Sequence, residues 1–173
     1  GGASYPLTGS TGDGYRLAEE AGHRIVPIRP ALVPLITAGP AVGRMADLQL
    51  RNILVRLFID GKKRAEAFGE LTFMDYGLSG PVILTLSGQI VDALREGQAV
   101  ALLLDLKPAL DEHKLDARLV RDFEQRRLEP ISSVLRGVLP REMVPVALEE
   151  IELDAERLAG TIRSGERKRL RHW

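Results

Sequence analysis

Residues 52–73 read NILVRLFIDGKKRAEAFGELTF, and this stretch predicts an antiparallel β-hairpin. The Asp60-Gly61 dipeptide in its middle is suited to the tight type I′ turn that joins two antiparallel strands. In the second strand apolar and polar residues alternate, a period of two typical of a half-buried strand. The residues that share its apolar face are Ala65, Ala67, Leu71 and Phe73. Phe68 interrupts the polar face, which suggests a second contact surface there.

The residues on the N-terminal side of the hairpin predict a short helix and then extended chain. Asp13 is suited to cap a helix in DGYRLAEEAG, and Gly22 is suited to end it. In the segment HRIVPIRPALVPLI, residues 23–36, three prolines exclude a helix and restrict any strand to an edge or a bulge.

The residues on the C-terminal side predict a helix and a buried strand. Ser79 is suited to cap the helix, Pro81 to lie in its first turn and Gly97 to end it. The apolar residues at helical spacing are Ile83, Leu86, Ile90 and Leu94. The run AVALLLDL, residues 99–106, is nearly all apolar and therefore predicts a buried strand.

From Lys107 onward, apolar stripes at helical spacing are separated by prolines, which predicts a small helical subdomain. The expected fold class is therefore α+β, with an antiparallel, barrel-like β unit followed by a helical unit.

Composition excludes several classes of function. Lysine and arginine number 24, as do aspartate and glutamate, so no net field favours nucleic acid or an anionic membrane. The chain has no cysteine, its three histidines lack the spacing of a metal site, and no apolar run is long enough to span a bilayer. We therefore expect a cytoplasmic protein with no metal, no nucleic-acid partner and no membrane partner.

The opening stretch GGASYPLTGSTGDGY is rich in glycine and hydroxyl side chains. It matches neither the Walker phosphate loop nor GxGxxG. A loop of this composition that leads into a helix suits an anionic ligand, although Asp13 would repel a phosphate and would instead accept a hydrogen bond from a hydroxyl. A plain flexible loop or an expression linker remains the alternative.

Three segments together resemble one known family. They are the opening stretch, residues 1–15; GHRIVPIRPALVPL, residues 22–35; and GELTFMDYGLSGP, residues 69–81. The chain resembles the inserted part of the bacterial aminoacetone oxidase-like flavoproteins, which are FAD-dependent NAD(P)/FAD oxidoreductases. Met74 departs from the family pattern, in which threonine is usual.

The resemblance implies a Rossmann-type FAD domain that is interrupted by an insert, from which this chain is excised. It implies three parts: a severed flavin-domain loop and helix (residues 1–23), a β-barrel-like insert unit (24–106) and a helical insert unit (107–173). FAD is expected in the intact parent protein and none in this fragment, which we expect to be inactive alone. The expected partners are the missing FAD-binding domain and an unknown small-molecule substrate.

The resemblance also implies which residues lie beside the ligands. Those expected at the cofactor are Gly2, Ser4, Thr8, Gly9, Ser10, Thr11, Gly12 and Asp13. Asp75, Tyr76 and Ser79 are the expected substrate-side residues, and the Tyr76 hydroxyl is the candidate catalytic group because it could orient a carbonyl. Two alternatives stay open: Tyr76 only packs while Ser79 only caps a helix, or the whole chain is a stand-alone binding module without catalytic activity.

Overall fold

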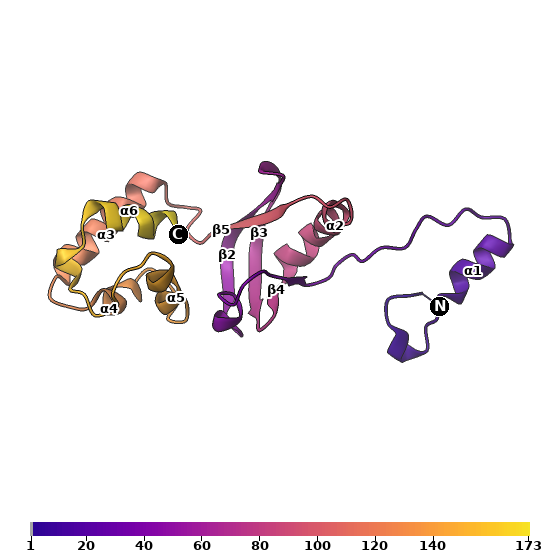
Figure 1. Ribbon diagram of the computed structural model, residues 1–173, viewed down its shortest axis with the longest axis horizontal. Coiled ribbons are helices and arrows are strands. Elements are labelled where there is room, and N and C mark those ends of the chain that lie inside the picture. Colours follow the sequence, from indigo (N-terminus) through magenta and orange to yellow (C-terminus); the bar gives the residue numbers. More distant parts are fainter. Residues whose placement is uncertain (1) are drawn as a thin grey trace. The chain divides into compact units, whose positions relative to one another are not determined.

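The computed structural model describes residues 2–173 (Figure 1). Gly1, the first residue of the segment matched to the family, lies outside the described residues. The chain divides into two compact units, Gly1–Pro30 and Ala31–Trp173. The division into residues 1–23, 24–106 and 107–173 stays a prediction.

The first unit consists of the short 3-10 helix η1 (Pro6–Thr8), the helix α1 (Asp13–Glu20) and extended chain. Gly12, at φ 82°, is the residue before α1, so Asp13 begins the helix and the prediction that it caps the helix is wrong. Gly22, at φ 88°, follows the end of α1 as predicted. No residue from 2 to 30 is buried, so this unit has no core of its own.

The second unit begins with an open antiparallel sheet. Its strands are β1 (Leu35–Ile36), β2 (Gln49–Ile59), β3 (Lys62–Met74), β4 (Gly77–Ser79) and β5 (Val100–Asp105), in the order β1-β4-β3-β2-β5. The 3-10 helix η2 (Gly43–Met45) lies between β1 and β2 in the chain. The hairpin prediction is confirmed: Ile59 pairs with Lys62, and both turn residues have positive φ, as a type I′ turn requires.

The hairpin has one buried face. In β3, Leu71 and Phe73 are buried, whereas Phe68 on the opposite face is 62% exposed. In β2 a bulge shifts the register between Leu50 and Ile53. Because a bulge adds a residue to one strand, it allows both of these side chains to be buried although simple alternation would separate them.

The helix α2 (Pro81–Arg95) packs against β3 and covers the buried face of the sheet (Figure 1). Its capping residue is Gly80, so the prediction for Ser79 is wrong: Ser79 lies in β4 and pairs with Thr72. The apolar stripe is confirmed except at Leu94, which is 55% exposed because the last turn buries Ala93 instead.

The strand β5 is at the edge of the sheet and pairs only with β2. The prediction of a buried strand is therefore wrong. Leu103 is 46% exposed, and Leu102 and Leu104 are half-buried. A continuous apolar run is common to central strands and to edge strands that are covered by other parts of a protein, so the run alone does not separate the two.

The rest of the chain is helical, as predicted. It comprises α3 (Glu112–Gln125), α4 (Ile131–Leu135), α5 (Met143–Glu150), η3 (Ala159–Thr161) and α6 (Ser164–His172). These helices enclose a second apolar cluster around Phe123, Ile131 and Leu135. Leu139 and Trp173 pack against both this cluster and the cluster beneath the sheet. The α+β class, a half-barrel sheet followed by helices, is confirmed.

Polar side chains tie the helical half together. Arg126 and Ser133 donate hydrogen bonds to the Glu129 carboxylate, which lower the pKa of Glu129 to about 2. Asp116 accepts a hydrogen bond of 2.9 Å from Arg167, so α3 and α6 are joined by an ion pair. No helix within residues 2–173 combines the length and the apolar character needed to cross a membrane.

Candidate functional site

The opening loop is closed by its own backbone. The Gly12 N–H donates to the Gly2 carbonyl oxygen at 3.1 Å, and the Gly9 N–H donates to the Pro6 carbonyl oxygen at 3.0 Å. Gly9 and Gly12 both have φ near 80°, a conformation that side chains with a Cβ rarely adopt. No atom from elsewhere in the chain lies within 4 Å of a Cβ built at Gly9. The need for glycine at this position therefore comes from the backbone conformation and not from crowding.

Several of the predicted cofactor residues of this loop carry hydroxyl groups. Thr8 Oγ1 donates to the Tyr5 carbonyl oxygen at 2.7 Å and lies 3.1 Å from Ser10 Oγ. Thr11 Oγ1 donates to Asp13 Oδ2 at 2.5 Å, which places a carboxylate at the first turn of α1. A carboxylate there disfavours a phosphate group but accepts hydrogen bonds from ribose hydroxyls. The side-chain chemistry of the loop therefore fits one hydroxyl-bearing edge of a dinucleotide, and its assignment to FAD stays a prediction.

The predicted substrate-side residues lie on a second, separate feature. Asp75 and Tyr76 form the turn between β3 and β4, and Ser79 ends β4. Tyr76 is 45% exposed, and its carbonyl oxygen accepts a hydrogen bond of 3.2 Å from the Thr37 N–H. The backbone of the turn is thus fixed while the phenol side chain is accessible.

Close backbone packing requires Gly77 and Gly80 of the same segment, and also Gly43 of η2, which packs against its turn. A Cβ on Gly77 would lie 1.9 Å from the Leu35 carbonyl oxygen, and a Cβ on Gly43 would lie 2.5 Å from the Asp75 carbonyl oxygen. Gly80 has φ 98° and lies against the β3 backbone. These contacts give a structural reason for much of the GELTFMDYGLSGP segment that is independent of any ligand.

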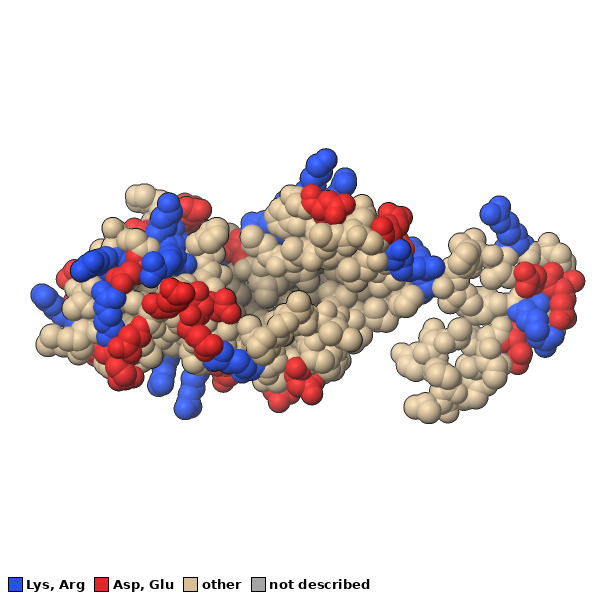
Figure 2. Space-filling model, in the orientation of Figure 1, with Lys and Arg blue, Asp and Glu red and all other residues tan. Residues whose placement is uncertain are grey.

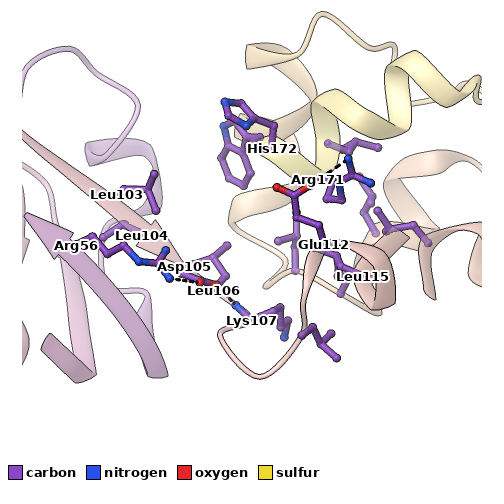
Figure 3. A pocket seen from close by; sticks show the side chains of 17 residues that line it. Arg56, Leu103, Leu104, Asp105, Leu106, Lys107, Glu112, Leu115, Arg171 and His172 are labelled. Carbon is purple, nitrogen blue, oxygen red and sulfur yellow. Dashed lines mark hydrogen bonds and ion pairs between the residues drawn. The ribbon is translucent and has the colours of Figure 1, made fainter. Parts of the chain in front are cut away.

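Sequence reasoning missed a cavity of about 360 Å³ between β5 and the helical half (Figure 3). Its polar rim includes Arg56, Lys107 and Arg171, which are separated by long stretches of sequence. A second hollow of about 620 Å³ lies along β5 and reaches other strands of the sheet. Trp173 lines both the cavity and this hollow. No spacing motif links these residues, so only the fold identifies them.

The surface charge is distributed unevenly. Figure 2 shows lysine, arginine, aspartate and glutamate side chains intermingled over the helical half, whereas the visible face of the sheet half is largely uncharged. Ion pairs such as Arg167 with Asp116 and Arg157 with Glu166 account for part of this mixing. No group of histidine, aspartate or glutamate side chains that could hold a metal ion occurs among the described residues.

Comparison with known proteins identifies the family. The chain is 29% identical over 153 residues to the 3-dehydro-bile acid delta(4,6)-reductase of Clostridium scindens, a match covering 86% of this chain and 36% of the relative. It is 26% identical to the ribosomal RNA dihydrouridine synthase of Haemophilus influenzae and 32% identical to that of Escherichia coli K12. These matches cover 87% and 83% of this chain and 34% and 33% of the relatives, respectively.

The chain thus spans about a third of the length of the curated relatives it matches. Residues 29–173 match the family model described as the HI0933-like protein barrel and H2TH domain. The family resemblance drawn from the three sequence segments is confirmed, and the chain belongs to the HI0933-like family, of which it contains the barrel and H2TH domain.

Proposed function

We propose that the chain is the substrate-side region of a longer FAD-dependent oxidoreductase that reduces a carbon–carbon double bond conjugated to a carbonyl group. The observation that supports it is the match to a delta(4,6)-reductase and to dihydrouridine synthases, of which the chain spans about a third. A 3-dehydro, Δ4,6 bile acid and uridine share such a conjugated double bond in a ring. Flavins supply hydride to polarised double bonds of this type.

The opening loop is proposed to hold one edge of the FAD in the intact protein. Thr8, Ser10 and Thr11 offer hydroxyls, and Asp13 offers a carboxylate that accepts hydrogen bonds from hydroxyl groups. Gly9 and Gly12 allow the positive φ that turns the loop toward α1. Gly2 and Ser4 are both exposed and are proposed to contact the same ligand.

Tyr76 is proposed to orient the carbonyl group of the substrate. Its side chain is accessible on a turn whose backbone is hydrogen-bonded to Thr37, the residue after β1, so the phenol extends from a fixed backbone. A phenol that donates to a carbonyl oxygen polarises the conjugated double bond toward hydride addition. Asp75 and Ser79 are proposed to contact the substrate on either side of Tyr76.

A small-molecule substrate is proposed in preference to ribosomal RNA. The chain has a formal net charge of zero, and positive and negative side chains intermingle over the helical half (Figure 2). RNA binding draws mainly on surfaces where lysine and arginine gather without acidic neighbours. The proposed partners are accordingly a FAD-binding domain and a small molecule.

The decisive experiment compares this 173-residue chain with the product of the full-length gene. We expect the full-length protein to be yellow and to retain FAD, and the chain alone to be colourless and to bind FAD more weakly than micromolar. A colourless full-length protein without reductase activity would support a stand-alone binding module instead.

Variants of the full-length protein test the loop and Tyr76. Gly9→Val and Gly12→Val should abolish FAD retention, whereas Gly22→Val should not, although it imposes the same positive-φ strain at the other end of α1. Tyr76→Phe should lower kcat without changing flavin content. Full flavin content in both loop variants would remove the cofactor assignment, and an unchanged kcat would remove the role of Tyr76.

A further inference from the structure

We propose that the cavity between β5 and the helical half binds a small amphipathic anion, with an apolar ring system inside and one negatively charged group at the rim. The cavity holds about 360 Å³, within the range of about 300–1,000 Å³ typical of small-molecule sites. The inference rests on the residues that line the cavity and not on the proposed flavin chemistry.

The interior of the cavity is apolar and is contributed by separate elements. The strand β5 and the residue after it supply Leu103, Leu104 and Leu106, and α3 supplies Leu115 and Leu119. Burial of a ring system against these side chains removes apolar surface from water on both sides of the ligand. The second hollow shares Leu103, Leu104, Leu106 and Trp173 with this cavity, so apolar space continues along the strand.

Two of the three rim cations are already neutralised. Arg56 lies 3.2 Å from an Asp105 oxygen and 3.7 Å from a Glu66 oxygen. Arg171 lies 3.5 Å from a Glu112 oxygen, and Figure 3 shows this pair on the helical side. These arginines line the cavity, but each of them already has a carboxylate partner within the chain.

Lys107 differs from both arginines. It is half-buried at the rim, on the turn that leaves β5, and no ion pair joins its ammonium group to a carboxylate among residues 2–173 (Figure 3). An ammonium group without a counter-charge favours an anion and disfavours a cation. The combination of an apolar floor and one unpaired cation therefore selects a ligand with one acidic group.

Trp173 provides a local probe of this site. It is the only tryptophan in the chain and lines both hollows, so a dye bound at this place lies beside it and receives its energy efficiently, and the variants at Lys107 and Leu103 then locate the dye. The test uses 8-anilinonaphthalene-1-sulfonate and N-phenyl-1-naphthylamine, which have the same ring system with and without a sulfonate. We expect one sulfonate dye per chain, about tenfold tighter binding of it than of the neutral dye, and energy transfer from Trp173.

Two variants and one control distinguish binding in the cavity from nonspecific dye binding elsewhere on the surface. Lys107→Met should reduce the affinity for the sulfonate dye about tenfold, to that of the neutral dye, whose affinity should not change. Leu103→Glu should abolish binding of both dyes, and circular dichroism should show it folded because Leu103 is 46% exposed. Leu128→Glu, at a residue that is 79% exposed and outside the cavity, should change neither affinity.

Equal affinity for the two dyes, an unaffected Lys107→Met variant, or dye binding that survives Leu103→Glu would each overturn the proposal. The same titration on the full-length protein separates a ligand from a covering segment. Binding that keeps its dependence on Lys107 there would support the ligand site. Loss of binding there would show that the parent polypeptide itself fills the cavity, and the ligand assignment would be withdrawn.

Discussion

Phe68 and Phe73 are a matched pair for testing which face of the sheet forms the core. Both lie on β3, five positions apart and hence on opposite faces, but Phe68 is 62% exposed and Phe73 is 1% exposed. Truncation of a fully buried phenylalanine to alanine removes its transfer free energy and leaves a cavity, at a cost of about 3–5 kcal/mol. Truncation of Phe68 loses only cross-strand contacts, at a cost of about 0.2–1 kcal/mol.

Urea unfolding measures the difference. With a slope of about 2 kcal/mol per molar urea, a loss of 4 kcal/mol lowers the midpoint by about 2 M for Phe73→Ala. Phe68→Ala should lower it by less than about 0.5 M. Circular dichroism follows the secondary structure as a whole, and Trp173 fluorescence follows the packing between the two clusters. Similar midpoint losses in the two variants would refute the assignment of the buried face.

Three further predictions concern single side chains. Gly77→Ala should destabilise the protein severely in thermal unfolding, because its Cβ would lie 1.9 Å from a backbone oxygen. The control is Gly88→Ala in α2, where no atom lies within 4 Å of the added Cβ. This variant should be neutral or stabilising by up to about 1 kcal/mol. Ser87→Ala should cost about 1–3 kcal/mol in urea unfolding, since the buried hydroxyl accepts a backbone hydrogen bond at 3.3 Å from the proline-rich segment; an unchanged midpoint would contradict this. The Arg126 guanidinium and the Ser133 hydroxyl lower the pKa of the Glu129 carboxylate to about 2. The contribution of this carboxylate to folding stability is therefore complete above about pH 4.5 and is lost as the pH falls toward 2. The stability difference between wild type and Glu129→Gln should shrink over that interval, and a difference that is independent of pH would count against it.

The sequence predicts those helices and strands that are determined by residues close together in the chain. The hairpin depends on the Asp60-Gly61 turn and on alternation in β3, and both are readable from neighbouring residues. The start of α2 was misplaced because Ser79 and Gly80 can both cap a helix, and pairing of Ser79 with β3 decides between them. The burial of β5 was overestimated because an apolar run does not reveal how many neighbours a strand has.

The candidate sites also divide into those that a continuous segment reveals and those that only long-range packing creates. The opening loop and the Tyr76 turn were recognisable because each is a continuous segment of a family motif. The cavity was not, because its walls join Arg56 from β2, Leu103 from β5 and Trp173 at the far end of the sequence. Long-range packing brings these residues together, and no short spacing encodes it.

The position of β2 within the sheet has a consequence for the order of folding. Its pairing with β3 closes a turn of two residues, whereas its pairing with β5 joins Ile59 to Val100 and encloses β3, β4 and α2. Closure of the longer loop costs more entropy before it gains any contact, so we expect the hairpin to form first and β5 to join last. Substitutions in the hairpin should then slow folding, whereas substitutions in β5 should mainly accelerate unfolding, which stopped-flow kinetics would distinguish. The cavity beside β5 would accordingly be among the last features to form and the first to open.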